Sequence, residues 1–307
     1  MVRHNGVVEL RHLRYFVAAA EDLSISRAAV RLHISQPPLT RQIHDLEDEI
    51  GTALFDRSNK KLRLTSAGEY FLQEARKILS QAQRAARIAK ATGNGQGGQI
   101  TIAFLSPLGG IFLPAVIRSF KHKFPLVDVD LVEMVPRKQL DALLENQIDL
   151  AFVAKHEVES DKELAFEPVM EVELRMALAL EHPLAKLSRI PLAEMAEERF
   201  IILKRSAAPA IHEFLLRLCR SAGFEPNVVK QSDRPQSILD LVAAGIGVSI
   251  VPEHFQRYQA QCVMRPLIPT PPVIPVCMVW RQDDTSSALQ AFCAMTRQYF
   301  CSRRKLK

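Results

Sequence analysis

The segment LSISRAAVRLHISQPPLTRQIHDLEDE, residues 23–49, determines how the first third of the chain folds. Apolar residues recur at helical spacing in two runs, which are separated by a short break at His33 and Ile34. Neither run is long enough to form a stable helix alone. We therefore predict two short helices, N-capped by Ser26 and Ser35, that are joined by a tight turn in a helix-turn-helix arrangement.

The outward face of the second predicted helix carries polar side chains suited to DNA contact. In a recognition helix that enters the major groove, the N-terminal residues reach the base edges. Gln pairs bidentately with adenine and Arg with guanine, whereas Ser and Thr contact bases or phosphates. An ordinary hairpin with a solvated N-terminus has the same spacing and remains an alternative. The candidate DNA-binding residues are Ser35, Gln36, Thr40 and Arg41, together with Pro37 and Pro38, which fit the opening turn.

Three further segments complete the N-terminal third. DRSNKKLRLT, residues 56–65, reads as two short strands of a basic β-hairpin, or wing. Its Arg57, Lys60 and Lys61 are further DNA-binding candidates that would contact phosphates, and an ordinary charged surface hairpin remains the alternative. Residues 66–91 have a long helical pattern with a narrow, alanine-rich seam, which suits packing either against a second copy or on its own domain. GNGQGGQ, residues 93–99, lacks apolar residues and predicts a flexible hinge.

From Ile100 onward, strand and helix patterns alternate, which predicts an α/β domain with mainly parallel sheets. Two lobes are expected, with the chain crossing between them near Glu167 and returning near Pro266. The predicted strands cover residues 100–105, 127–133, 149–154, 173–180, 199–203, 227–232, 247–252 and 274–280. The predicted helices include residues 110–122, 137–145, 208–222 and 235–243.

Charge, apolar runs and cysteine usage fit a DNA-binding protein of the cytoplasm. Residues 1–92 hold 15 Lys and Arg against 10 Asp and Glu, whereas residues 93–307 hold 25 against 24, so the positive excess lies where DNA contact is expected. No apolar run approaches the roughly 18 residues needed to cross a bilayer, and no apolar core near the N-terminus resembles a secretory signal. Five cysteines without a CxxC pair fit reduced thiols in a cytoplasmic protein.

Neither a catalytic motif nor a metal or cofactor site is predicted. Gly245 and Gly247 precede a predicted strand instead of following one, so they do not form a dinucleotide fingerprint. GxSxG, HExxH and P-loop motifs are absent from the sequence.

The N-terminal segment resembles the DNA-binding domain of the LysR-type transcriptional regulators. The resemblance runs without a gap from Leu10 to about Leu72 and includes RAA at 27–29, SQPPLTRQI at 35–43 and LTSAG at 64–68. It implies a dimeric or tetrameric regulator of promoter DNA that activates through RNA polymerase and often represses its own gene. The implied domains are a winged helix-turn-helix at 8–65, a linker and dimerisation helix at 66–92, a hinge at 93–99, and an effector-binding domain at 100–307. The last resembles periplasmic binding proteins, with lobe I at about 100–167 and 267–307 and lobe II at about 168–266.

Two segments of the α/β domain are candidates for binding a small carboxylate. Ser106 and Leu108 follow a strand of one lobe and open a helix, where free N–H groups favour an anion. Lys204, Arg205 and Ser206 follow a strand of the other lobe, so the two segments could clamp a ligand between the lobes. Ordinary helix capping explains each segment equally simply.

The family resemblance adds three candidate residues to this clamp. Related regulators of aromatic-acid breakdown hold a Ser and a Thr at the matching positions; Ser106 matches the Ser, but Pro136 stands where the Thr is found. Pro209 and Val273 align with apolar walls of the ligand site. An aromatic or dicarboxylic acid effector is therefore expected. The remaining alternatives are a solute-binding protein, or a ligand-binding α/β enzyme with a fused DNA-binding domain.

Overall fold

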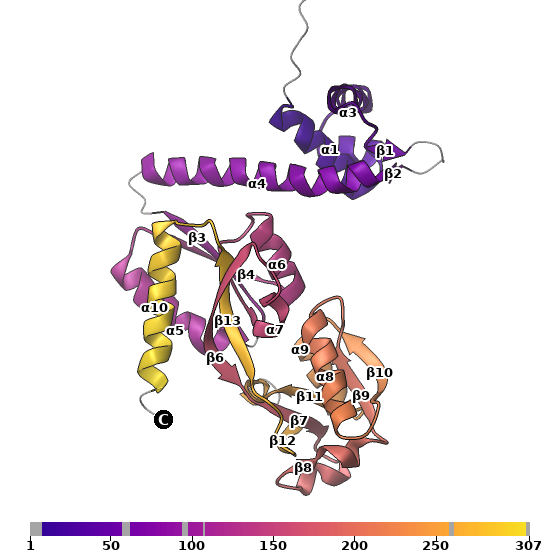
Figure 1. The fold of residues 1–307 in the computed structure, drawn as a ribbon, viewed down its shortest axis with the longest axis vertical. Coiled ribbons are helices and arrows are strands. Elements are labelled where there is room, and N and C mark those ends of the chain that lie inside the picture. Colours follow the sequence, from indigo (N-terminus) through magenta and orange to yellow (C-terminus); the bar gives the residue numbers. More distant parts are fainter. Residues whose placement is uncertain (1–7, 57–61, 94–97, 107, 258–260, 305–307) are drawn as a thin grey trace, which may run out of the picture. The chain divides into compact units, whose positions relative to one another are not determined.

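The computed structural model describes residues 8–56, 62–93, 98–106, 108–257 and 261–304. The chain divides into two compact units, Met1–Lys90 and Ala91–Lys307 (Figure 1), and each is described here by itself. Among the described residues, no helix is both long and apolar enough to span a bilayer.

The N-terminal unit is a helix-turn-helix followed by a two-stranded hairpin and a long helix. Its elements are α1 (Leu10–Asp22), α2 (Ile25–Arg31), α3 (Gln36–Ile50), β1 (Phe55–Asp56), β2 (Arg63–Leu64) and α4 (Ser66–Gly93). Both predicted hairpin helices are confirmed. Gly51 ends α3 in the left-handed conformation, with φ of 78°, which a glycine adopts without strain.

One apolar core joins all the helices of this unit. Leu13 and Phe16 of α1 lie against the buried alanines of α2 and against Leu39 and Ile43 of α3. The Phe16 ring contacts Phe55 of β1, with centroids 5.3 Å apart, and it also contacts a ring of α4. The helices α1, α2 and α3 have only 13, 7 and 15 residues and are at best marginally stable alone, so this shared core holds α3 in place.

Two details of helix capping differ from the sequence prediction. Ser24, not Ser26, caps α2: its hydroxyl accepts a hydrogen bond from the Arg27 amide at 3.4 Å. Ser35 does precede α3 as its N-cap residue, but its hydroxyl makes no capping hydrogen bond. The Ser35 side chain is therefore left exposed beside the outer face of α3.

The seam predicted along α4 divides into two parts. Phe71 and Ala75 belong to the core of their own unit, where Ala75 is fully buried. Farther along, Ile78 is 47% exposed and Ala85 is also exposed. Phe71 and Ala75 therefore serve their own domain, whereas Ile78 and Ala85 are exposed.

The C-terminal unit contains two sheets, each covered by helices on both faces. The first sheet has the order β4-β3-β5-β13-β6. Helices α5 and α10 cover one of its faces, while α6 and the short α7 cover the other. The bounds are β3 (Gln99–Phe104), α5 (Leu108–Lys123), β4 (Asp128–Glu133), α6 (Pro136–Leu144), β5 (Leu150–Ala154), α7 (Lys155–Val158), β6 (Leu164–Val172), β13 (Ile274–Arg281) and α10 (Ser287–Arg304).

The second sheet lies in the middle of the sequence. Strands β11, β7, β12 and β8 pair in that order, β9 pairs with β10, and a bridge from Phe200 to Val248 links the two groups. Helices α8 and α9 cover opposite faces. The bounds are β7 (Leu174–Ala179), β8 (Ile190–Pro191), β9 (Arg199–Leu203), α8 (Pro209–Ser221), β10 (Asn227–Ser232), α9 (Pro235–Ala243), β11 (Ser249–Pro252), the 3-10 helix η3 (Glu253–Arg257) and β12 (Cys262–Ile268).

The prediction of mainly parallel sheets is wrong, because both sheets are mixed. β3 pairs in parallel with β4 and β5, but β13 pairs antiparallel with β5 and β6. β6 and β12, which were not predicted, carry the chain out of the first sheet and back toward it. The change of sheet falls at Glu173 on the way out, later than the predicted crossing near Glu167, and between Ile268 and Ile274 on the return.

A buried arginine links two connections of the first sheet, the one from α6 to β5 and the one from β13 to α10. Arg281, at the end of β13, is 5% exposed and donates to the carbonyl oxygens of Leu143 and Ile148 at 2.9 and 2.6 Å. The same guanidinium donates to Asp284 at 2.6 Å. Asp149 lies 3.5 Å away and also accepts a hydrogen bond from the Thr101 amide of β3, so this aspartate has a structural role.

Candidate nucleic-acid interface and interlobe cavity

The N-terminal half of α3 presents a shallow concave surface to solvent. The predicted residues Gln36, Pro37, Thr40 and Arg41 line it, and Ser35 lies exposed immediately before them. Pro37 and Pro38 occupy the first turn, which confirms their predicted position. The structure therefore brings all six predicted residues of this helix together on one exposed segment.

Two side chains of this surface are already oriented by hydrogen bonds. The Ser26 hydroxyl donates to the Gln36 side-chain oxygen at 3.0 Å, and the Thr40 hydroxyl donates to the Gln36 carbonyl at 3.1 Å. Arg41 is exposed and forms no ion pair within the described part of the chain. Its guanidinium is thus available for a forked contact, whereas the Gln36 amide is held in a defined orientation.

Sequence reasoning missed two residues of this surface. His44 lines the same concavity one turn beyond Thr40, and the four-residue spacing from Gln36 through Thr40 to His44 could have identified it. Ser26 was interpreted as a helix cap, but it instead orients Gln36 from the preceding helix. No spacing within α3 alone could have revealed that contact.

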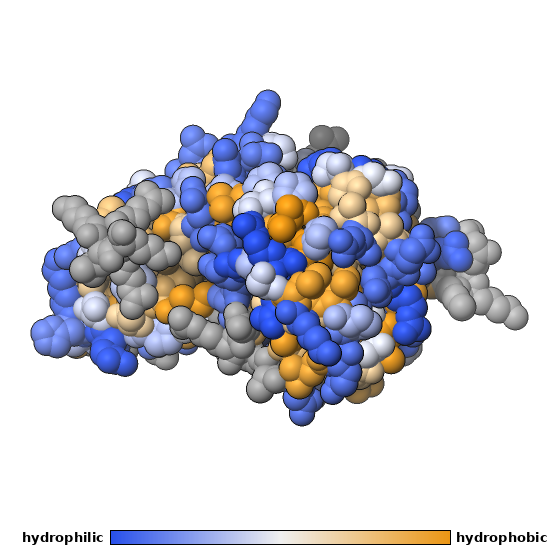
Figure 2. All heavy atoms as spheres, turned by 90° about the horizontal axis from the view of Figure 1, so that it is seen from below, coloured by the Kyte–Doolittle hydropathy of each residue, from blue (hydrophilic) through white to orange (hydrophobic). Residues whose placement is uncertain are grey.

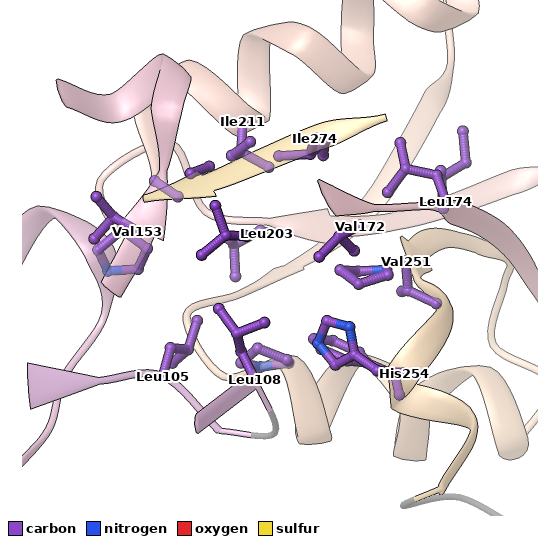
Figure 3. Close-up of a pocket in the computed structure, with 18 of the residues that line it drawn as sticks. Leu105, Leu108, Val153, Val172, Leu174, Leu203, Ile211, Val251, His254 and Ile274 are labelled. Carbon is purple, nitrogen blue, oxygen red and sulfur yellow. The ribbon is translucent and has the colours of Figure 1, made fainter. Parts of the chain in front are cut away.

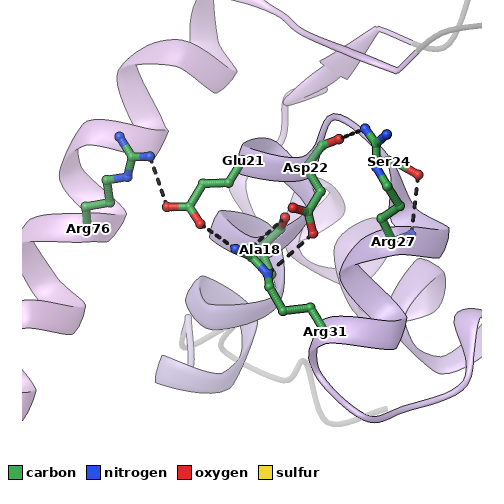
Figure 4. Close-up of polar contacts among 7 residues, drawn as sticks. All are labelled: Ala18, Glu21, Asp22, Ser24, Arg27, Arg31 and Arg76. Carbon is green, nitrogen blue, oxygen red and sulfur yellow. Dashed lines mark hydrogen bonds and ion pairs between the residues drawn. The ribbon is translucent and has the colours of Figure 1, made fainter.

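A cluster of ion pairs holds α2 and α4 against α1 (Figure 4). Glu21 of α1 lies 3.0 Å from Arg31 of α2 and 3.0 Å from Arg76 of α4. Arg31 also donates to the Ala18 carbonyl at 2.9 Å and pairs with Asp22 at 3.4 Å. Partly exposed pairs of this kind each stabilise only slightly, but together they connect α2 and α4 to the end of α1.

The wing is attached to α3 through a buried carboxylate. Glu47 is 8% exposed and accepts hydrogen bonds from the amides of Leu54 and Phe55 at 2.8 and 2.9 Å. β1 and β2 then pair antiparallel, with Asp56 opposite Arg63. The predicted basic residues Arg57, Lys60 and Lys61 lie outside the described residues.

A cavity of about 130 Å³ lies where the two lobes of the C-terminal unit meet. Figure 3 shows Leu108 and Leu203 extending into it from α5 and β9, with His254 nearby. Its lining is overwhelmingly apolar, and among the described residues only three side chains there carry a polar atom. These are Ser106, Ser249 and His254.

The structure brings three of the eight predicted effector residues into this cavity. Ser106, Leu108 and Pro136 line it. Lys204, Arg205 and Ser206 are instead exposed in the turn after β9, where the amides of Ala207 and Ala208 donate back to the Lys204 carbonyl. Pro209 begins α8 outside the lining, and Val273 is 39% exposed. The two-sided clamp inferred from the sequence is therefore not assembled in this cavity.

Sequence reasoning missed Ser249 and His254. Ser249 is 1% exposed and begins β11, within the otherwise apolar run GVSIVP. A buried hydroxyl in such a run is a recognisable signal. His254 lies in η3, and its ring contacts Phe255 with centroids 4.9 Å apart.

Direct contacts join the lobes next to the cavity. The Glu157 carboxylate of α7 accepts the Ile211 amide at 2.9 Å, in the first turn of α8. The Arg137 amide donates to the Ala207 carbonyl at 3.0 Å, and the His156 ring contacts that of Phe214, with centroids 5.3 Å apart and the ring planes tilted by 45°. Burial raises the pKa of Glu157, an effect that the Ile211 and Ala210 amides oppose.

The cysteines are poor nucleophiles in this fold. Burial raises the pKa of Cys219, Cys262 and Cys277 to about 11 and that of Cys293 to about 12. A thiol with so high a pKa stays protonated and unreactive at neutral pH. Cys301 is the exposed one. The part of the chain that the structure describes holds no group of three or more His, Cys, Asp or Glu side chains placed to bind a metal.

Comparison with known proteins relates both units to one family. The model of "Bacterial regulatory helix-turn-helix protein, lysR family" matches residues 10–69, and that of "LysR substrate binding domain" matches residues 93–301. The HTH-type transcriptional regulator AlsR of Bacillus subtilis (strain 168) is 36% identical over 81% of this chain and 82% of its own. The Hca operon transcriptional activator HcaR of Escherichia coli (strain K12) is 32% identical over 96% of this chain and 99% of its own.

One of the similar solved structures is a protein–DNA complex. Full-length CbnR complexed with its target DNA superposes with a TM-score of 0.73 at 27% identity, covering 95% of this chain and 100% of that one.

Proposed function

Because the chain belongs to the LysR family of bacterial transcriptional regulators, with a DNA-binding and an effector-binding domain, we propose that its α3 surface reads the operator and its interlobe cavity holds the effector. The chain is thus a regulator and not an enzyme. The observation that supports recognition of the operator by α3 is its exposed, polar N-terminal face. On this face Gln36 is oriented by a hydrogen bond and Arg41 is exposed to solvent. Effector binding would shift the lobes and so change how the reading heads sit on promoter DNA.

We propose domain limits that follow from these elements. Residues 8–65 would form the DNA-binding domain, 66–92 the linker helix, 93–99 the hinge, of which 94–97 lie outside the described residues, and 100–307 the effector-binding domain. The chain passes from lobe I to lobe II at Glu173 and returns to lobe I between Ile268 and Ile274, where it changes sheet. The exposed part of α4 around Ile78 would pair with a second copy, so the protein would bind as a dimer or tetramer.

Two further assignments rest on this role. Regulation of transcription would involve contact with RNA polymerase at the promoter, with activation or repression depending on where the operator lies. A protein that binds bacterial promoters works in the cytoplasm, where the chromosome is.

Selection from a library of short duplexes tests the reading role. We expect the full chain at moderate salt to recover an inverted repeat, because two-fold symmetric reading heads demand a two-fold symmetric site. The bound duplexes would be sequenced after several rounds. Uniform recovery of all sequences, with and without pooled small aromatic molecules, would contradict the proposal.

The wing should affect affinity without affecting sequence choice. Replacing Lys60 and Lys61 with Ala should weaken binding to cognate and scrambled duplexes alike, because phosphate contacts carry no sequence information. The slope of log affinity against log salt should fall by about one for each phosphate that the variant no longer neutralises. Lys138→Ala, an exposed lysine of the other unit, provides the matched control. An unchanged slope in the wing variant would remove the wing from the interface.

A further inference from the structure

The chemistry of the interlobe cavity differs from the carboxylate clamp expected from the sequence. Among the described residues its lining includes no lysine, arginine or acidic side chain. Ser106 and Ser249 each offer one hydroxyl, from the β3–α5 connection and from β11 respectively, and His254 offers an imidazole. All the other lining side chains are apolar (Figure 3).

One anion position near the cavity, the N-terminus of α8, is already filled by the protein itself. The first turn of α8 borders the cavity through Ala208 and Ile211, and a helix N-terminus of this length attracts carboxylates. Glu157 from the other lobe occupies this position, with its carboxylate 2.9 Å from the Ile211 amide. Lys204 and Arg205, the nearest predicted cations, are exposed in the preceding turn and do not line the cavity.

Desolvation then decides which ligands can enter. A carboxylate moved from water into an apolar space without a cation pays a large penalty, whereas a hydroxyl needs only one hydrogen-bond partner to compensate. The volume of about 130 Å³ is close to that of an apolar protein cavity of roughly 150 Å³ that binds benzene. A single ring with one small substituent matches this space.

We propose that the cavity binds a compact, uncharged molecule with a ring-sized apolar body and one hydrogen-bonding group, such as a phenol or an aromatic alcohol. Ser106, Ser249 or His254 receives the polar group, and Leu108 and Leu203 contact the ring. This inference rests on the proposed role of the cavity as the effector site, and it replaces the acid expected from the sequence with a neutral ligand.

Matched pairs of probes test the inference on the full chain. Phenol and benzyl alcohol would be compared with benzoate and phenylacetate by calorimetric titration and by thermal unfolding, since a bound ligand raises the unfolding midpoint. We expect the neutral probes to bind at least about tenfold more tightly than the carboxylates. The comparison is made at pH 6 and pH 8, because the carboxylate probes are ionised at both.

Three variants locate the binding. Leu108→Trp should fill the cavity and abolish binding of the neutral probes. Leu131→Trp, at an exposed leucine of β4 outside the cavity, should leave it unchanged. Leu108→Ala covers the case in which tryptophan disturbs the fold: it should enlarge the cavity, keep the preference for neutral molecules and admit 2-naphthol.

The outcomes separate the inference from the proposed function. Tight carboxylate binding at either pH that Leu108→Trp abolishes would overturn the neutral ligand class and retain the cavity as the effector site. Binding that persists in Leu108→Trp, or no binding by any probe, would overturn both the ligand class and the cavity assignment. The duplex selection would still test DNA reading independently.

Discussion

In a dimer that places two α3 helices on one operator, Arg41→Ala should lower the preference for cognate over scrambled duplex by about 2–6 kcal/mol. Each of the two α3 helices contributes about 1–3 kcal/mol of this loss. The reason is that the substitution removes a forked guanidinium–guanine pair from both halves of one symmetric complex. Gln36→Ala should act similarly at a different base, because Ser26 orients the Gln36 side chain at 3.0 Å. Competition binding with both duplexes measures the ratio.

Arg217→Ala is the matched control, since this arginine is exposed on α8 in the other unit. It should leave the cognate-to-scrambled ratio unchanged. Equal losses of affinity on both duplexes in Arg41→Ala would show a phosphate contact and remove Arg41 from base reading. No loss of affinity on either duplex would remove it from the interface.

Arg281→Met should destabilise the C-terminal unit by about 3–5 kcal/mol. The variant leaves Asp284, which is 4% exposed, as a buried charge without its cation, and it removes the donors to the Leu143 and Ile148 carbonyls. Denaturant unfolding followed by tryptophan fluorescence reports this directly. The single tryptophan of the chain, Trp280, is the neighbouring residue of β13.

Two comparisons establish the cause of this destabilisation. Arg217→Met, on the surface, should change the free energy of unfolding by less than about 0.5 kcal/mol. The double variant Arg281→Met with Asp284→Leu should recover part of the stability, because replacing a whole buried pair by apolar groups is far less costly than removing one partner. A destabilisation below about 1 kcal/mol in Arg281→Met would mean that water solvates the aspartate.

The N-terminal unit was largely predictable because its signals are local. Apolar spacing, the two prolines of α3 and Gly51 determine where helices begin and end within a few residues. The exception is informative: Ser24 and Ser26 are both good capping residues two positions apart, and local pattern cannot choose between them. The choice follows from the tertiary contact of Ser26 with Gln36.

The C-terminal unit was predictable in class but not in strand direction. Apolar runs mark β3, β5 and β9, but β6 includes Glu167 and Pro168 at the edge of its sheet and gave no such run. Whether a strand runs parallel or antiparallel depends on partners far away in the sequence. The lining of the interlobe cavity was hard to predict for the same reason: helix N-termini can be found locally, but Glu157, which occupies the one on α8, lies in another lobe.

Much of the exposed surface is hydrophilic, as Figure 2 shows for one face, and the large exposed apolar residues are distributed over many elements. Leu131 on β4 and Leu180 after β7 are examples. Single exposed leucines such as these two are ordinary for a folded protein and need no partner.

The carboxylate of Glu47 has a consequence for DNA geometry. Since it bonds two successive amides at the start of β1 from the C-terminal half of α3, the separation between recognition helix and wing strand is fixed by the protein. A duplex whose grooves do not match that separation must itself widen, narrow or bend, and the energy of doing so varies with base sequence. Base steps that neither element touches would therefore contribute to operator choice through their stiffness.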